Sequence, residues 1–268
     1  MKRALTQAFT KGHENLVCEF NVTLKNNYLH MKKSVNPIFS TFILPGIFCI
    51  AMGVLEAIVV IYLRRIYYPQ GFDFPIKFLS PHMLLTEWIR EIATIIMLVV
   101  IGIMASKDNL LRFLYFLFSF AIWDITYYVA LKAFLNWPAS LLTWDILFLI
   151  PVPWLGPVLA PVICSITMIF FAISFVWLKK TFPAFKIKLY EWGLILLGAT
   201  FIFITFILDY STFLMQSGFS IPDTNLVISE FVPAKFSWFL FGAGEAIILY
   251  GIGSVIYRTI KKSQYRLR

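Results

Sequence analysis

The stretch of sequence that decides the fold is residues 112–161, RFLYFLFSFAIWDITYYVALKAFLNWPASLLTWDILFLIPVPWLGPVLAP. Its first half is an apolar run long enough to cross a bilayer, since a transmembrane helix needs ~20 mostly apolar residues. One acid, Asp124, interrupts this run near its middle. The second half cannot continue as a helix, because Pro151 and Pro153 lack the backbone donor and obstruct the preceding turn. The stretch therefore predicts a membrane span followed by an irregular segment.

The composition of the whole chain predicts the same class of protein. Of its 268 residues, 60% are hydrophobic and only 14% are charged, and the mean hydropathy is +0.80. A water-soluble domain of this length cannot hide so much apolar surface, so lipid must solvate much of it. The net charge of +9 comes from basic residues that flank apolar runs, which is typical of a membrane protein and not of a nucleic-acid-binding surface. We therefore expect an all-α integral membrane protein whose partner is the lipid bilayer, with no nucleic acid.

Six apolar windows are long enough to span a membrane. They cover residues 40–64, 87–106, 112–135, 155–178, 190–214 and 236–257. We expect a six-span domain over residues 39–258, a basic segment without fixed structure over 1–38 and a basic tail over 259–268. Residues 137–154 are too short and too rich in proline to span. They are interpreted as an interfacial or re-entrant half-helix that starts near Pro138 and is anchored by tryptophans at the membrane surface.

The first residues leave a choice open. No continuous apolar stretch occurs there, so a cleavable signal peptide is not expected. Met31, followed by Lys32 and Lys33, would be a natural start before the first span. Residues 1–30 are therefore either part of the native protein or an upstream extension.

The basic residues predict the orientation of the bundle. Most of the 23 Lys and Arg residues lie in the N-terminal segment, in the connections between spans two and three and spans four and five, and in the tail. With six spans these segments share one side, which the positive-inside rule identifies as the cytoplasm. Both termini are then cytoplasmic. Arg64 and Arg65, at the outer end of the first span, are the main exceptions.

Several charged residues fall at a similar depth in different spans. At 1.5 Å per residue they lie in the outer half of the membrane, where an unpaired charge costs at least ~2.5–3.5 kcal/mol near the midplane. A shared polar cavity that opens outward accounts for them economically. We expect it to bind a cation or proton, with these residues as the candidate site: Glu56, Glu91, Asp124 and Glu245, and Arg90 at the rim.

Each of these residues also has a purely structural interpretation. Glu56 and Glu245 follow small residues, a pattern that also suits close helix packing. Asp124 could bond to Tyr127 or Tyr128 of its own helix. The structural alternative for Arg90 is a local ion pair on its own helix face, with Glu87 or Glu91. Asp145, of the second Trp-Asp pair, is expected to be a cap or loop residue.

Three classes of function remain open on this basis. A transporter or channel would use the acids as a cation or proton site beside the broken segment. A membrane-embedded enzyme would use them as metal ligands or as an acid and a base, but no catalytic residue can be assigned. No histidine lies in a span, so haem and typical zinc sites are not expected, whereas carboxylate oxygens would suit Mg²⁺, Ca²⁺ or Mn²⁺. An accessory subunit would use the acids to lock helices together, with another membrane protein or a second copy as its partner.

Two strings carry a resemblance, GVLEAIVVIYLRRIYYPQGFDFP (53–75) and WDITYYVALKAFLNWPASLLTWDILFLIPVPWLGPVLAP (123–161). They resemble a family of uncharacterised polytopic bacterial membrane proteins, over roughly the first four spans. The resemblance implies a multi-pass protein of the bacterial inner membrane and carries no activity.

Overall fold

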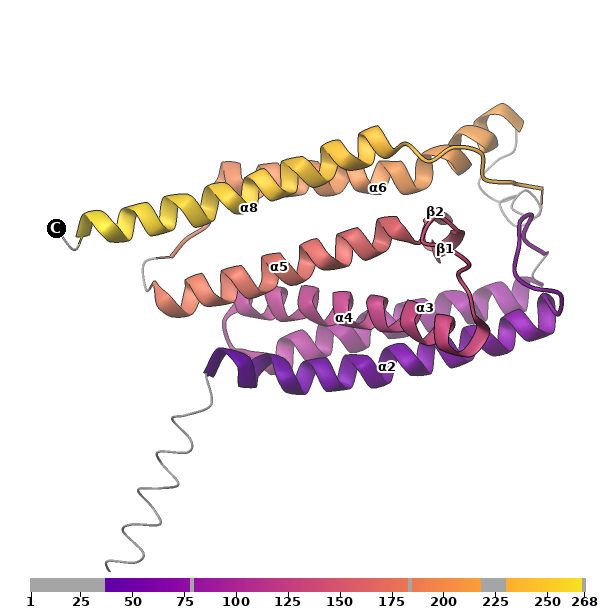
Figure 1. The fold of residues 1–268 in the computed structure, drawn as a ribbon, viewed down its shortest axis with the longest axis horizontal. Coiled ribbons are helices and arrows are strands. Elements are labelled where there is room, and N and C mark those ends of the chain that lie inside the picture. The colour runs from indigo at the N-terminus through magenta and orange to yellow at the C-terminus, as the bar shows by residue number, and fades with distance from the viewer. Residues whose placement is uncertain (1–36, 78–79, 183–184, 218–229, 267–268) are drawn as a thin grey trace, which may run out of the picture. The chain divides into compact units, whose positions relative to one another are not determined.

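The computed structural model describes residues 37–77, 80–182, 185–217 and 230–266. Within these ranges the chain forms long helices and one small sheet (Figure 1). The helices are α2 (Pro37–Tyr67), α3 (Pro81–Ala105), α4 (Asn109–Leu135), α5 (Leu159–Thr181), α6 (Leu189–Ser217) and α8 (Trp238–Arg266). Two strands, β1 (Trp144–Phe148) and β2 (Trp154–Pro157), lie between α4 and α5. Nearly all of the predicted segment 1–38 lies outside the described residues.

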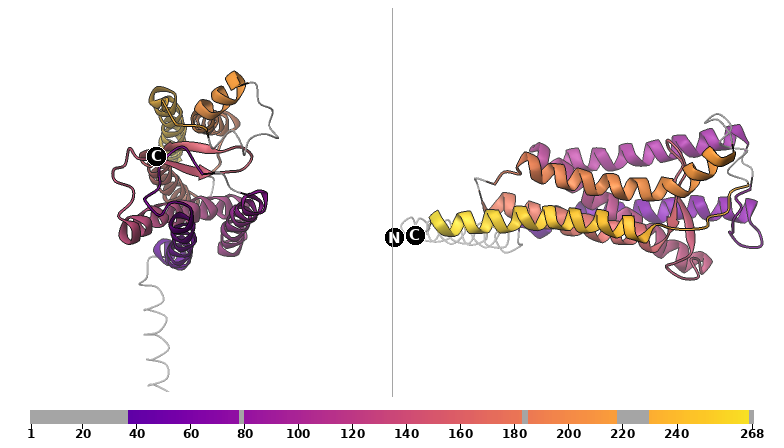
Figure 2. Two further views of the ribbon diagram at one scale, coloured as in Figure 1. Left: turned by 90° about the vertical axis from the view of Figure 1, so that its right-hand side faces the viewer. Right: turned by 90° about the horizontal axis from the view of Figure 1, so that it is seen from above.

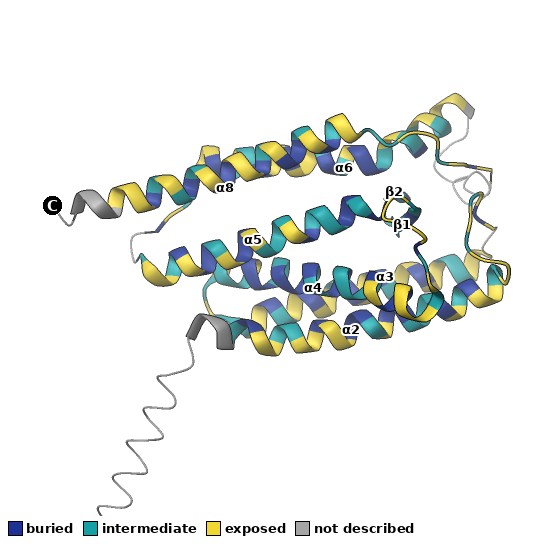
Figure 3. Cartoon of the chain, in the orientation of Figure 1, coloured by how far each residue is buried: buried dark blue, intermediate teal, exposed yellow. Residues whose placement is uncertain are grey.

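Six helices in the described ranges are long and apolar enough to cross a membrane. Their number and order confirm the prediction of six long apolar helices. Large apolar side chains such as Leu189 and Phe239 are about nine-tenths exposed on the outside of the bundle, and the buried residues face the neighbouring helices (Figure 3). This is the pattern of a multi-pass membrane protein, in which lipid takes the place of a further protein layer.

Local sequence signals fix where the helices begin and end. Pro81 occupies the first turn of α3, where its missing N–H is not needed, and the Ser80 hydroxyl caps the helix by accepting the backbone N–H of Met83. Asp108 caps α4 by accepting the backbone N–H of Leu111. Asn136 ends α4 in the left-handed conformation.

The described residues from Pro45 onward pack as one compact unit. Within it α3 packs on α4, α4 on α5, α5 on α8 and α8 on α6 (Figures 1 and 2). The α6–α8 contact is very close, because a Cβ atom added at Gly198 would lie 2.5 Å from the carbonyl oxygen of Gly244. Glycines at such a crossing let two helix backbones approach, as is common in membranes. Gly244 of α8 therefore serves the packing of this helix on α6.

The prolines between α4 and α5 do not lead to the predicted half-helix. Residues 144–157 form an antiparallel hairpin instead, in which Asp145 lies opposite Gly156 and Ile146 opposite Leu155. Aromatic and β-branched residues in β1 favour a strand, and Pro151 and Pro153 fall in the turn, where no ladder donor is required. The half-helix interpretation was wrong because it considered only helices for a segment at the end of a membrane bundle.

The hairpin also changes two predicted boundaries. The fourth span begins at Leu159 and not at residue 155, since residues 154–157 belong to β2. At the other end of the chain α8 continues to Arg266. Most of the predicted tail therefore extends the last helix.

Candidate functional site

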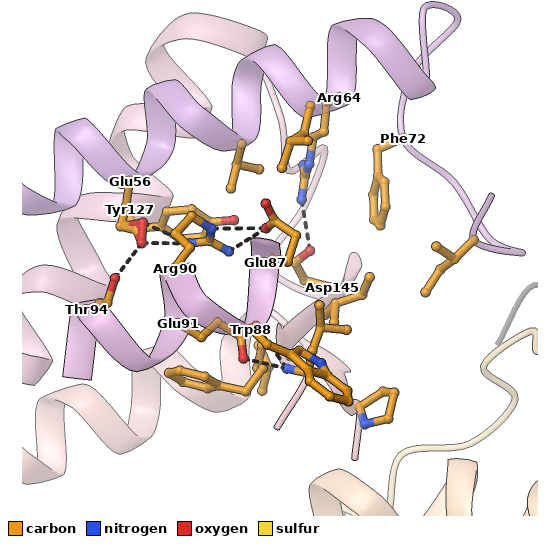
Figure 4. A pocket seen from close by; sticks show the side chains of 18 of the residues that line it. Glu56, Arg64, Phe72, Glu87, Trp88, Arg90, Glu91, Thr94, Tyr127 and Asp145 are labelled. Carbon is orange, nitrogen blue, oxygen red and sulfur yellow. Dashed lines mark hydrogen bonds and ion pairs between the residues drawn. The ribbon is translucent and has the colours of Figure 1, made fainter. Parts of the chain in front are cut away.

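A cavity of about 450 Å³ lies where α2 ends, α3 begins and the hairpin covers α4 (Figure 4). Its walls come from these three helices, from β1 and the residues that follow it, and from the α2–α3 connection. The cavity combines charged and aromatic side chains. Five carboxyl groups line it, from Glu56, Glu87, Glu91, Asp124 and Asp145, together with three basic groups, from Arg64, Lys77 and Arg90.

Arg90 connects α3 to α2 through Glu56. Its Nη1 donates to both carboxylate oxygens of Glu56, at 2.6 and 2.8 Å, and its Nε donates to Glu87 at 3.0 Å. The Thr94 hydroxyl adds a bond of 2.7 Å to Glu56. Arg90 is thus the centre of this network, and the predicted local pair with Glu87 is one part of it. Because Glu56 already has a counter-charge, it is a poor primary site for a cation.

A second ion pair joins the end of α2 to the hairpin. Arg64 Nη2 donates to Asp145 Oδ1 at 2.9 Å, and the guanidinium lies 3.6 Å from the ring centre of Trp137 and 4.3 Å from that of Phe72. Arg64 is 7% exposed and Asp145 1% exposed. Burial raises the pKa of Asp145 to about 6, although the Arg64 charge acts in the opposite direction.

This buried pair leaves two polar atoms without a partner. Neither Arg64 Nη1 nor Asp145 Oδ2 makes a hydrogen bond, and both atoms are buried. One is a donor and the other an acceptor. Such groups are costly in a protein interior unless something supplies the missing bonds.

Glu91 and Asp124 are held by hydrogen bonds from neutral groups. Both oxygens of Glu91 accept the backbone N–H of Leu149, just after β1, at 3.0 Å. Asp124 Oδ2 accepts the Ser165 hydroxyl of α5 at 2.8 Å, and not a tyrosine of its own helix. Among the ion pairs of the described residues, none involves either acid. These two acids are therefore the carboxyl groups in the cavity wall without a cationic partner.

Glu245 does not belong to this cavity. It lies on α8, and α5 stands between α8 and α4 (Figure 1). The Thr167 hydroxyl of α5 donates to Glu245 Oε2 at 2.8 Å, and Glu245 is not among the residues that line the cavity. The prediction that four acids converge is thus wrong for Glu245, because equal depth does not imply that two side chains face each other.

Three residues of the site carried no functional role in the sequence interpretation: Arg64, Glu87 and Asp145. Two signals in the sequence pointed to Arg64 and Asp145. Arg64 was a basic residue on the side that the positive-inside rule leaves poor in charge, which indicates a buried partner. The repeated Trp-Asp pair marked Asp145 as the counterpart of Asp124.

In the described part of the chain, no three His, Cys, Asp or Glu residues are grouped so as to hold a metal ion. Comparisons of the chain with known protein families, with curated proteins and with solved structures gave no match. The bacterial family of the sequence resemblance therefore stays a prediction. The geometry of the cavity carries the functional argument.

Proposed function

We propose that the protein binds a small organic cation in this cavity and transports it across the membrane. The setting that we propose is a bacterial inner membrane, with both termini in the cytoplasm and the cavity opening outward. The positive-inside distribution supports this orientation, because the cavity lies at the end of the bundle where α2 ends and α3 begins, opposite most of the basic residues.

The observation that carries the proposal is the surplus of carboxyl groups over basic groups in one partly apolar cavity. Five acids face three bases, and Glu91 and Asp124 form none of the ion pairs of the described residues. Burying an anion without a counter-ion costs roughly several kcal/mol per ion, even after the protein has relaxed around it. A bound cation would remove this cost, and it would gain most from the two acids that have no cation already.

The walls favour an organic cation over a metal ion. Eight aromatic side chains line the cavity: Tyr67, Tyr68, Phe72, Trp88, Trp123, Tyr127, Tyr128 and Phe148. The faces of aromatic rings attract amines and quaternary ammonium groups, and the volume of about 450 Å³ falls in the range of small-molecule sites, roughly 300–1,000 Å³. A hard metal ion would instead need several converging oxygen ligands.

Binding can be tested with two compounds of similar shape and opposite charge. Phenethylamine should stabilise the purified protein against heat, whereas phenylpropionate should not. Glu91→Gln and Asp124→Asn keep the acceptors for Leu149 and Ser165, and each should weaken amine binding by roughly tenfold or more. The control is Glu230→Gln, which changes an exposed acid outside the cavity and should leave binding unchanged.

Other outcomes would decide between the alternatives. Equal stabilisation by both compounds would refute a cation site. If no amine binds, and the only effect of the Glu91 and Asp124 variants is a loss of stability or assembly, then the acids lock helices together and the protein is an accessory subunit. Binding without uptake of labelled phenethylamine into proteoliposomes would leave a binding protein and exclude transport of this compound.

A further inference from the structure

The Arg64–Asp145 pair lies in the wall of the cavity and has an unused donor beside an unused acceptor. Arg64 Nη2 and Asp145 Oδ1 satisfy each other at 2.9 Å, which leaves Arg64 Nη1 and Asp145 Oδ2 buried without hydrogen bonds. Both residues line the cavity, and Figure 4 shows the pair beside Phe72. The unused atoms thus belong to two residues of the cavity wall.

Packing holds these two atoms in place. The Arg64 guanidinium lies against the rings of both Phe72 and Trp137, which contact each other edge to face, and Asp145 belongs to the paired strand β1, opposite Gly156. Neither side chain can turn toward water without losing these contacts. A polar pair held rigidly in this way is typical of a recognition site, because the ligand and not the protein then makes the adjustment.

The chemistry of the two atoms limits the group that can bind. Arg64 Nη1 needs an acceptor, and Asp145 Oδ2 needs a donor. A carboxylate or phosphate would satisfy the arginine but would be repelled by the aspartate and by the other acids of the cavity. A second ammonium group would satisfy the aspartate but not the arginine. A neutral group with both functions, such as a primary carboxamide or a hydroxyl, satisfies both atoms.

We propose that Arg64 and Asp145 form a subsite for a neutral donor–acceptor group of the ligand, so that the ligand is an amine with a carboxamide or hydroxyl at its far end. This inference rests on the proposed binding of an organic cation. Glu56 and Arg64 are eight residues apart on α2, or ~12 Å along the helix axis. Glu91 directly follows Arg90, the partner of Glu56. The ammonium end of the ligand therefore lies at the level of Glu56. Its neutral end lies ~12 Å nearer the C-terminal end of α2, at the level of Arg64.

The test uses phenethylamine and its para-hydroxyl, para-carboxamide and para-carboxylate derivatives, with affinities measured by calorimetry on the full chain. The para-carboxamide should bind roughly tenfold or more tightly than phenethylamine, since hydrogen bonds to charged groups are among the stronger ones. The hydroxyl derivative should lie between them, and the carboxylate should bind most weakly. This series uses only the unaltered protein, so misfolding of a variant cannot affect the comparison.

The double variant Arg64→Gln/Asp145→Asn removes both charges together and keeps two hydrogen-bonding side chains. It should lose the preference for the carboxamide, so that phenethylamine and its para-carboxamide derivative bind the double variant with equal affinity. If phenethylamine binds and the para substituents make no difference, or the preference survives in the double variant, this inference is overturned while the cation site stands. If none of the four compounds binds, the proposed function is overturned as well.

Discussion

The ion pair between Glu56 and Arg90 gives the sharpest test of how the charges of the cavity stabilise the fold. The perturbation is a double-mutant cycle with Glu56→Gln, Arg90→Gln and both together. Glu56 is 7% exposed at its side chain and Arg90 24% exposed, and their closest contact is 2.6 Å. Gln keeps a hydrogen-bonding group of similar length in each case and removes the charge.

The expected magnitude follows from the burial of the pair. Two charges about 4 Å apart attract each other by ~4 kcal/mol at an effective dielectric constant of 20. Breaking a buried pair by removing one partner costs about 3–5 kcal/mol, since the other charge stays buried. Arg90 retains Glu87, so Glu56→Gln should lie at the lower end, near 3 kcal/mol. Arg90→Gln alone leaves both Glu56 and Glu87 without a counter-charge. The double variant leaves only Glu87 unpaired, so it should cost less than Arg90→Gln alone and less than the sum of the two single variants.

The free energy of unfolding can be measured by titration with sodium dodecyl sulfate in mixed micelles. The chain offers a matched control in the ion pair between Lys179 and Asp108, whose side chains are 33% and 38% exposed. The same cycle there should give a coupling of only about 0.2–1 kcal/mol. If the effects of Glu56→Gln and Arg90→Gln simply add, or their coupling is as small as that of the control pair, the reasoning from burial fails.

Three further predictions concern packing, acidity and topology. Gly198→Ala should lower the free energy of unfolding by about 1–3 kcal/mol, because the new methyl group would meet the backbone of α8, whereas Gly193→Ala, with nothing within 4 Å, should not lower it. The pKa of Asp145, raised by burial to about 6, means that the folded state holds more protons than the unfolded state between about pH 4 and 6. Stability relative to Asp145→Asn should therefore fall by roughly 2–3 kcal/mol as the pH rises through this window, and an equal pH profile for both proteins would exclude a raised pKa. In a cysteine-free background, single cysteines at Lys186 and Glu230 should react with impermeant maleimide from opposite faces of the membrane, with Glu230 outside; labelling of both from one face would refute the topology.

The helices could be predicted from the sequence because each is long, apolar and bounded by local signals. In a bilayer every backbone group must be satisfied within the segment, so a long apolar run has little choice but a helix. The hairpin could not be predicted in the same way. Its strands are only five and four residues long, and short apolar runs are compatible with either a strand or a helix. What stabilises this hairpin comes from elsewhere, in the bond from the Leu149 N–H to Glu91 of α3 and in the packing of β2 on α6.

The depth of each residue along its helix predicts only part of this site. The depth of a residue follows from its position along a span at 1.5 Å per residue, and for this reason Glu56, Glu91, Asp124 and Arg90 were expected together and do line one cavity. The direction in which a side chain points, and the helix that it meets there, depend on packing between segments far apart in the sequence. Glu245 has a suitable depth but meets Thr167 of α5 instead.

The energetics of buried charge explain why the missing residues of the site were basic ones or had basic partners. A buried acid is tolerated only when it has a counter-charge or hydrogen bonds. Each such acid therefore implies a partner, but the sequence alone does not identify which residue this partner is. Glu56 forms an ion pair with Arg90, and Asp145 forms one with Arg64. Glu91 instead accepts a hydrogen bond from a backbone amide, and Asp124 accepts one from a hydroxyl. A buried carboxylate held by one neutral donor keeps most of its attraction for a cation. The acids whose partners in the fold are weakest are therefore the ones that a ligand can still satisfy, and this makes Glu91 and Asp124 better candidates for binding than Glu56.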